Sequence, residues 1–222
     1  MKKKIFRPII TIDGPAASGK GTIAKSVSKD FNLFYLETGI FYRLIGKFYL
    51  VSSNKSNIKK FLNSIRKESF LITKNDKQEL YNEDVAEKAS FLAKSKEVRS
   101  FVLTKQLEML MHYPKEFNGV ILEGRDCGTV IVPNADIKFF LTANLEIRAK
   151  RRHQQLIVKD KKIIYDDVLM DLKVRDYNDT TRKNSPLVKA KDAIEIDCSS
   201  KDIKETIIIV KKFILSKLPY FK

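Results

Sequence analysis

The sequence predicts an α/β fold in which helices flank a five-stranded parallel sheet. Two observations lead to this prediction. Five short apolar segments recur along the chain, separated by segments with the 3.6-residue periodicity of helices. The apolar segments are continuous rather than alternating, which is typical of strands buried on both faces of a parallel sheet. The 222 residues are enough for a single domain with a substantial core.

The first third of the chain alternates strand, loop and helix. Residues 8–13 form a β-branched run that stops at a glycine, which predicts a buried strand. A glycine-rich loop follows, and 22–30 repeats apolar residues at helical spacing until Asn32 ends the helix. The short apolar segment 33–36 predicts the second strand. Apolar side chains then recur on one face of a predicted helix over 39–50.

The middle of the chain contains a polar, lysine-rich segment, 52–84, which we interpret as a small inserted lobe. Within it, 70–73 is a candidate strand. Helical periodicity returns over 85–111. Two further apolar runs, 120–122 and 137–141, predict the third and fourth strands.

The last third predicts a basic helix over 145–156, a second helix over 165–180, the fifth strand over 193–196 and a closing helix over 203–218. No internal repeat or low-complexity segment interrupts this order. In open parallel sheets, ligands bind at the carboxyl ends of the strands. We therefore expect the functional residues in the loops that follow the strands.

The chain carries a large positive charge, with 43 Lys and Arg against 27 Asp and Glu, a formal net charge of +16. Such a charge indicates polyanionic partners, of which nucleic acid is the most common. The lysines are scattered along the whole chain instead of forming one block. This distribution favours a solvated surface, with only a few arginines directed at phosphates.

Cysteine and histidine are too sparse for a metal or disulfide framework. Cys127 and Cys198 form no CxxC pair, and His112 and His153 are isolated. This pattern fits a reducing compartment. The apolar run behind the N-terminal lysines is too short for a signal peptide, and no segment approaches about 18 apolar residues. We therefore expect a cytoplasmic protein that does not bind a membrane.

The strongest motif follows the first strand and has the spacing G-x4-G-K-G-T. Glycines let the backbone turn so that successive N–H groups surround an anion, and the following helix adds its positive dipole end. The lysine reaches the β and γ phosphates of a nucleotide. The predicted ATP-binding residues are Gly14, Pro15, Ala16, Ala17, Ser18, Gly19, Lys20, Gly21 and Thr22.

One position of this loop departs from the common form. Gly21 stands directly after Lys20, where a serine or threonine hydroxyl usually contacts Mg²⁺. The metal must then be held by Thr22, by waters, by nearby carboxylates or by the nucleotide. The residues alone assign no direct protein ligand to the metal, and Thr22 is the one candidate hydroxyl. The G-K-G-T form resembles the nucleoside monophosphate kinases more than the switch GTPases or motor ATPases.

A guanine-binding interpretation competes with this one. Residues 73–76, Thr-Lys-Asn-Asp, match the [NT]-K-x-D signature of GTPases. A GTPase also needs a D-x-x-G motif between the two, and 23–72 contains none. We therefore interpret 73–76 as a turn in the polar lobe.

Three downstream segments combine arginines with polar or acidic residues. Thr38 and Arg43 lie in the first turns of a predicted helix, where a hydroxyl and an arginine can clamp phosphate. The run Glu-Gly-Arg-Asp at 123–126 closes the third strand, where ligand is expected. Arg175, Asp179 and Arg182 recur at helical spacing, so one helix face presents two guanidinium groups around a carboxylate. Alone, this last set is better explained by a surface salt bridge between residues one turn apart.

Together these segments resemble the bacterial-type cytidylate kinases, a family of P-loop nucleoside monophosphate kinases, over almost the whole chain. The most specific strings are G-R-D-x-G-T-V, which begins at Gly124, and R-D-x-x-D-x-x-R, which begins at Arg175. The sequence departs from the family pattern in three places. Thr38 replaces the usual serine, Glu123 replaces a common aspartate, and the inserted lobe over 68–85 is short.

The resemblance implies ATP-dependent phosphorylation of CMP and dCMP with Mg²⁺, by a monomer that binds no nucleic acid. It implies one kinase domain over 1–222, with a monophosphate-binding lobe over about 38–112 and a lid over about 150–187. The implied adenine site lies near 198–200. The implied CMP-binding residues are Thr38, Tyr42, Arg43, Ser90, Arg99, Arg125, Asp126, Arg175, Asp179 and Arg182. The residues implied to stabilise charge during catalysis are Lys20, Arg125, Arg148, Arg151 and Arg152.

Two other functions remain open from the residues themselves. One is a related kinase that acts on UMP, AMP or a non-nucleotide, because the specificity for cytosine rests on the resemblance. The other is a nucleic-acid-binding ATPase, which the net charge suggests. It would need aromatic residues interleaved with a basic stripe, whereas the arginines here cluster at the predicted ligand ends of strands.

Overall fold

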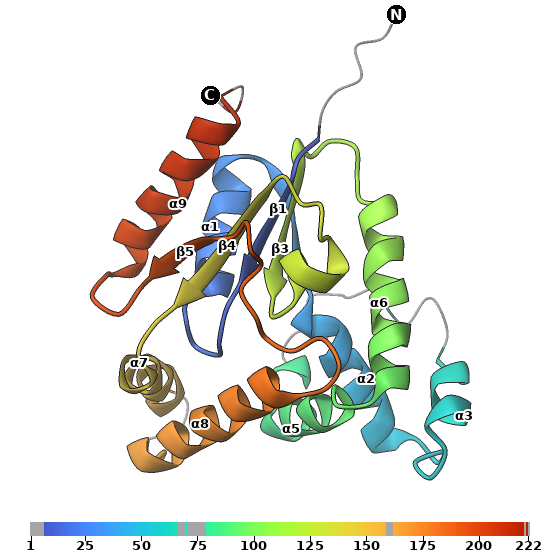
Figure 1. Ribbon diagram of the computed structural model, residues 1–222. Coiled ribbons are helices and arrows are strands. Elements are labelled where there is room, and N and C mark those ends of the chain that lie inside the picture. The colour runs from blue at the N-terminus through green and yellow to red at the C-terminus, as the bar shows by residue number, and fades with distance from the viewer. Residues whose placement is uncertain (1–6, 66–69, 71–78, 159–161, 220, 222) are drawn as a thin grey trace, which may run out of the picture. The chain divides into compact units, whose positions relative to one another are not determined.

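The computed structural model of the chain describes residues 7–65, 70, 79–158, 162–219 and 221 (Figure 1). The chain divides into two compact units. The first unit comprises Met1–Glu37 and Pro114–Lys222, and the second comprises Thr38–Tyr113. Within the described residues, no helix is long and apolar enough to cross a membrane.

The first unit is built on a five-stranded parallel sheet with the strand order β2-β3-β1-β4-β5. The central position of β1 places the loop that follows it in the middle of the sheet's carboxyl edge (Figure 1). The sheet confirms the predicted fold class. The strands are β1 (Ile9–Asp13), β2 (Leu33–Glu37), β3 (Gly119–Gly124), β4 (Ile137–Thr142) and β5 (Ile194–Asp197).

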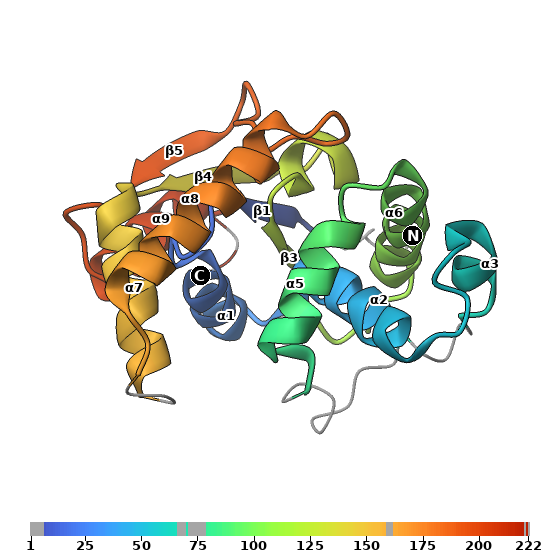
Figure 2. The ribbon, with the colours of Figure 1, turned by 90° about the horizontal axis from the view of Figure 1, so that it is seen from below.

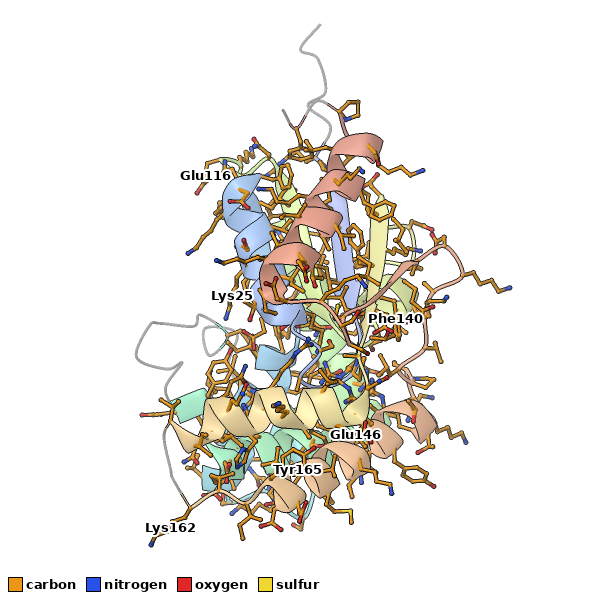
Figure 3. The ribbon with its side chains drawn as sticks, turned by 90° about the vertical axis from the view of Figure 1, so that its left-hand side faces the viewer. Lys25, Glu116, Phe140, Glu146, Lys162 and Tyr165 are labelled. Carbon is orange, nitrogen blue, oxygen red and sulfur yellow. The ribbon has the colours of Figure 1, made fainter. Side chains whose placement is uncertain are left out.

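Two helices, α1 (Lys20–Asp30) and α9 (Ile203–Lys217), pack side by side against one face of this sheet (Figures 1 and 3). Side chains of a strand alternate between the faces, so Ile10 and Ile12 point into this core, and both are fully buried. A capping box at Asp202 and Glu205 starts α9. The apolar layer fixes the sheet from which the site loops emerge.

The opposite face of β1 is covered by a short π-type helix, η2 (Cys127–Ile131), which follows β3. The approach is close: a Cβ added to Gly128 would lie 2.9 Å from Thr11 Oγ1 and 3.1 Å from the Lys138 side chain. A glycine at this position therefore lets the segment after β3 lie against the strand that precedes the phosphate loop.

Helices α7 (Leu145–Ile157) and α8 (Tyr165–Thr181) form a packed pair in the first unit (Figures 1 and 2). Ala149 of α7 and Leu172 of α8 are buried in one apolar cluster, together with Ala16 of the phosphate loop. The hydroxyl of Tyr165 donates to the carbonyl of Glu146 at 3.4 Å, and Figure 3 labels both residues. The cluster brings α8 into contact with the loop that follows β1.

The second unit is helical in its described part, with α2 (Gly39–Val51), α3 (Ile58–Asn63), α5 (Glu83–Leu92) and α6 (Lys96–Met111). Helices α2 and α5 pack closely at Gly46, where an added Cβ would lie 2.9 Å from the carbonyl oxygen of Val85. Phe70 stacks on Phe41 and lies 6.0 Å from Phe101, measured between ring centroids.

The elements differ from the sequence predictions in two places. The periodicity over 85–111 corresponds to two helices, because Ser95 caps a new helix by accepting a hydrogen bond from Val98 N at 3.3 Å. Helix α3 lies inside the polar segment 52–84, for which the sequence predicted only a candidate strand. Apart from Phe70, the candidate strand at 70–73 and the turn at 73–76 lie outside the described residues.

Candidate functional site

The phosphate loop connects β1 to α1, the strand-to-helix position that the motif requires. Two of its glycines have backbone angles that other residues rarely adopt, with φ of 153° at Gly14 and 90° at Gly19. A Cβ on Gly14 would lie 2.2 Å from the carbonyl oxygen of Leu141 in β4. Steric contact with the neighbouring strand thus explains why position 14 requires glycine, and backbone conformation explains why position 19 does.

Lys20, in the first turn of α1, is buried and folds back onto the loop. Its Nζ donates to the carbonyl oxygen of Pro15 at 2.9 Å. The pKa of Lys20 is lowered to about 7, first by burial and then by the nearby Arg125 guanidinium, while Glu123 opposes the shift. Two cationic side chains are thus held close to one another, which favours the binding of an anion between them.

Asp13, the last residue of β1, ties the phosphate loop to the segment after β3. Its two carboxylate oxygens accept hydrogen bonds from Cys127 N at 2.9 Å and Gly128 N at 2.8 Å. Burial raises the pKa of the Asp13 carboxyl, and these backbone donors oppose the rise. Sequence reasoning missed this residue. Its only signal was an acidic residue that ends a buried strand directly before the loop.

Glu123, near the end of β3, places a carboxylate beside the phosphate loop. It stands opposite Glu37 in the β2–β3 register and accepts a hydrogen bond from Tyr35 Oη at 3.4 Å. A Cβ on Gly21 would lie 3.7 Å from Glu123 Oε1. Burial raises the pKa of Glu123, Lys20 lowers it, and Glu37 raises it again.

This carboxylate fits a magnesium ion that is bound mainly through the nucleotide. Mg²⁺ in nucleotide sites usually takes one or two carboxylates plus phosphate oxygens and waters. Glu123 supplies a carboxylate next to the position where Gly21 lacks a hydroxyl. Among the described residues, no three or more His, Cys, Asp or Glu side chains form a site that could hold the ion alone.

Arg125, Asp179 and Arg182 form one charged network in the first unit. Arg125 Nε donates to Asp179 Oδ2 at 2.8 Å, and Arg182 Nη1 donates to Asp179 Oδ1 at 3.0 Å. Burial alone would raise the pKa of Asp179, but the three guanidinium groups of Arg125, Arg182 and Arg175 lower it. Burial also opposes the charge on Arg125, yet Asp179 raises the pKa of this guanidinium.

Further residues flank this network or hold its members in place. Arg175 is exposed on α8, one turn before Asp179, and acts on Lys20 through its charge. Asp126 is buried at the start of η2. Arg182 also donates to the carbonyl of Ser185 at 2.7 Å through Nε, which fixes the chain after α8. The structure therefore brings together the arginine–aspartate sets at 123–126 and 175–182, which are separated in sequence.

The three arginines of α7 have different surroundings. Arg148 is buried and contacts the carbonyls of Ala143 and Ala16 and the carboxylate of Asp176. Arg151 Nη2 donates to the carbonyls of Cys198 at 2.7 Å and Lys201 at 2.9 Å, in the loop after β5. Arg152 is exposed.

The remaining predicted residues lie in the second unit. Thr38 is buried ahead of α2, and its carbonyl accepts a hydrogen bond from Gln106 Nε2 at 3.1 Å. Arg43 Nη1 donates to the carbonyl of Leu80 at 2.9 Å, and its guanidinium lies 4.9 Å from the Tyr81 ring centroid. Gln106 and Tyr81 were not predicted, since neither carries a motif.

A second guanidinium of this unit also lies over an aromatic ring. Arg99 is buried, lies 5.4 Å from the Tyr42 ring centroid and donates through Nη1 to the carbonyl of Ala93 at 3.2 Å. Ser90 is partly buried on α5. The predicted acceptor residues thus fall into two groups, one in each unit.

Comparison with known proteins identifies the family. A family model described as cytidylate kinase matches residues 10–215. A cytidylate kinase of Clostridium tetani is 41% identical over 225 residues, 96% of each chain. Those of Clostridium acetobutylicum and Fusobacterium nucleatum are 39% and 40% identical, covering 94% and 92% of this chain and 98% and 95% of theirs.

A solved structure from Thermus thermophilus supports the fold. It has a TM-score of 0.51 with 17% sequence identity, and the match covers 96% of this chain and 98% of that one. The phosphate loop, the arginine–aspartate network and nearly full-length similarity to named enzymes agree. The chain belongs to the cytidylate kinase family.

Proposed function

We propose that this enzyme transfers the γ-phosphoryl group of ATP to CMP and dCMP, which yields ADP with CDP or dCDP. The observation that carries the proposal is the electrostatic interaction of Lys20 with Arg125 in the first unit. One residue belongs to the donor loop and the other to the predicted acceptor site. A phosphoryl group in transfer between two nucleotides is an anion that both side chains can stabilise.

The donor side of the proposal uses the loop at 14–22. Its backbone N–H groups and Lys20 bind the ATP phosphates, and the adenine lies near 198–200, a loop that Arg151 supports through the Cys198 carbonyl. Glu123, with Thr22, would hold the metal. Mg²⁺ would there neutralise the negative charge of the ATP phosphates.

On the acceptor side, Arg125 binds the phosphate of CMP, as its fork geometry suits two phosphate oxygens. Asp179 orients this fork from one side and also holds Arg182. Asp126 accepts from the cytosine amino group, and Arg175 and Arg182 contact the sugar and base. In this proposal the second unit adds contacts to CMP through Thr38, Tyr42, Arg43, Ser90 and Arg99.

Phosphoryl transfer then requires little covalent chemistry from the protein. The two nucleotides are held in line, and Lys20 and Arg125 neutralise charge on the transferring group, with Arg151 and Arg152 adding positive potential. Movement of the lobe at 38–112 and the lid at 150–187 would exclude water and limit ATP hydrolysis.

We further propose that the enzyme acts in the cytoplasm as a monomer, without a nucleic-acid partner. Cys127 and Cys198 are buried thiols that form no disulfide, as expected in a reducing compartment. The arginines of the site hold specific carboxylates and carbonyls instead of forming an open basic stripe. They are therefore better suited to a small anionic substrate than to a polymer.

A coupled ADP-release assay tests this function. CMP, dCMP, UMP, AMP, GMP and single-stranded nucleic acid are compared as stimulants of ATP turnover. We expect CMP and dCMP to give the highest kcat/KM. A strong preference for UMP or AMP would change the substrate, and stimulation by nucleic acid without any monophosphate would exclude a nucleotide kinase.

A further inference from the structure

Arg148 is the buried centre of a contact set that joins three segments of the first unit. Only 7% of its side chain is exposed. Its Nε donates to the carbonyl of Ala143 at 2.8 Å, at the turn between β4 and α7. Its Nη1 donates to the carbonyl of Ala16 at 3.2 Å, inside the phosphate loop. The same nitrogen lies 2.6 Å from Asp176 Oδ2 on α8.

Asp176 belongs to the side of α8 that faces the protein. It follows the buried Val168 and Leu172 at four-residue intervals, the spacing of one helix face. Its carboxylate is 20% exposed, and its Oδ1 is buried and has no hydrogen-bond partner among the described residues. Three residues later, Asp179 holds Arg125 and Arg182. The helix therefore has one acidic residue facing the donor loop and another facing the acceptor arginines.

The packing around this ion pair makes the link rigid. Ala16 of the phosphate loop is buried in the same apolar cluster as Leu172 of α8 and Ala149 of α7. A displacement of the loop by a nucleotide would therefore act on α8 both through the packed side chains and through the Arg148 bridge. Close-packed interiors transmit such strain because they have few voids.

We propose that Arg148 and Asp176 form a positioning pair that couples the ATP loop to the CMP-binding face of α8. In this role the pair touches no substrate. When the phosphate loop moves, the pair moves α8 with it and so changes the position of Asp179. Because Asp179 holds Arg125, the position of Arg125 changes as well. The inference rests on the proposed function, because it concerns how the donor and acceptor sites of that reaction communicate.

This role differs from the one that the family resemblance implies for Arg148, direct stabilisation of the transferring phosphoryl group. Two of its guanidinium nitrogens, Nε and Nη1, already donate to backbone carbonyls. Its charge is balanced by the carboxylate of Asp176 at 2.6 Å. An arginine that acts on a transferring phosphate would have to give up these contacts and leave the mostly buried Asp176 charge unpaired, which is costly.

The two roles predict opposite effects of Asp176→Asn. If Arg148 stabilises the phosphoryl group, removal of its carboxylate partner frees the guanidinium, and kcat is unchanged or higher. If the pair positions α8, Asp176→Asn and Arg148→Lys each lower kcat about tenfold to a hundredfold, as expected for a misplaced catalytic group. The double variant is then no worse than either single one, because both remove the same link.

A binding experiment measures the coupling itself. Isothermal titration gives the affinity for CMP with and without a non-hydrolysable ATP analogue that carries Mg²⁺. The ratio of the two dissociation constants in the wild type is the coupling factor, typically about five- to 150-fold in coupled sites. We expect this factor to fall to about one in Asp176→Asn. Asp30→Asn is the matched control, since it removes an exposed ion pair of α1 with Lys211 at 3.1 Å.

A double variant distinguishes the loss of coupling from simple unfolding. In Arg148→Met combined with Asp176→Met, no unpaired charge is buried, so thermal stability should stay close to the wild type. The directional bridge to Ala16 is absent, and the coupling factor should still fall to about one. Retained coupling in this folded variant, or an undiminished kcat in Asp176→Asn, would overturn the proposal. A wild type that phosphorylates no monophosphate would instead reject the proposed function.

Discussion

At the residue scale, Arg125 is held in place by the protein and, in the proposed function, also binds the substrate. It is nearly buried, with 17% of its side chain exposed, and its charge is held by Asp179 at 2.8 Å. The carboxylate occupies one edge of the guanidinium fork through Nε. The site therefore holds the arginine in place before substrate arrives, so binding does not have to order a flexible side chain.

Arg125→Ala should lower kcat/KM for CMP by about 10² or more, the loss expected when a preorganised charge is removed from a developing anion. The fold should persist, since Asp179 keeps its contact with Arg182 at 3.0 Å. The coupled assay and a thermal melt measure the two effects. Arg125→Lys is the control, because it keeps the charge and loses the fork. Wild-type activity in Arg125→Ala would remove the residue from the site.

Gly14 is fixed by its surroundings. Its φ of 153° disfavours other residues, and a Cβ would meet the Leu141 carbonyl at 2.2 Å. We expect Gly14→Ala to destabilise the protein by about 1–3 kcal/mol, the usual cost of local backbone strain. Chemical denaturation measures the change. Gly39→Ala is the matched control because a Cβ there meets nothing within 4 Å, and equal stability losses at both positions would contradict the steric explanation.

The lowered pKa of Lys20 predicts how stability depends on pH. The folded, nucleotide-free enzyme releases this proton near pH 7, whereas the unfolded chain holds it until about 10.4. Between these values the unfolded state binds more protons, so the contribution of Lys20 to stability rises with pH. Below pH 7 both states are protonated, and the cost of the buried charge is fully present.

Comparison of the wild type with Lys20→Met tests this dependence by urea denaturation at several pH values. The variant should be the more stable protein at pH 6, and the difference should shrink steadily towards pH 10. Parallel pH profiles for the two proteins would show that Lys20 titrates outside this range.

At the element scale, the sequence located most of the strands and helices because their apolar patterns are local. The break between α5 and α6 was not visible in the periodicity over 85–111, since the apolar spacing continues through a turn of three residues. Ser95 marks the break only by its capping bond to Val98 N. A serine inside a periodic segment is equally compatible with a helix interior, so tertiary packing decides.

Ser95→Ala should lower the stability of the protein by about 0.5–2 kcal/mol, the usual loss for an N-cap. The hydroxyl also donates to Glu97 at 2.7 Å, so the change removes two local bonds. Urea denaturation gives the value. Thr104→Ala serves as control, because its hydroxyl lies in the interior of α6 and donates to the carbonyl of Ser100 in the preceding turn. A smaller loss at Ser95 than at Thr104 would argue against the cap.

The difference between local sequence patterns and tertiary packing also explains which residues of the candidate site could be predicted. Lys20, Arg125 and Asp179 belong to motifs with a fixed spacing, so their chemistry is visible in the chain. Asp13 and Asp176 act through partners that are distant in sequence: Asp13 bonds to Cys127 N, 114 positions away. No local pattern carries such a contact. Only the packing of β1 against η2, and of α8 against α7, brings these groups together.

At the scale of the whole molecule, the net charge of +16 should act on the substrates from a distance. ATP and CMP are both anions, and a positive surface raises their local concentration and their association rates. The Debye length falls from about 30 Å at 0.01 M salt to about 8 Å at 0.15 M. Raising the salt concentration should therefore lower kcat/KM for both nucleotides several-fold while kcat changes little.

A charge-reduced variant separates this long-range effect from contacts inside the site. Lys204, Lys212 and Lys217 are exposed on α9, a helix that carries none of the predicted site residues. Their exchange for glutamate should lower kcat/KM at low salt and make its salt dependence shallower, with kcat preserved because Lys20 and Arg125 are unchanged. Exchange for glutamine gives a graded control with half the loss of charge. The wild type, the glutamate variant and the glutamine variant could instead show the same dependence of kcat/KM on salt. In that case salt would screen only charges within the site, and the lysines of α9 would have no part in attracting the nucleotides.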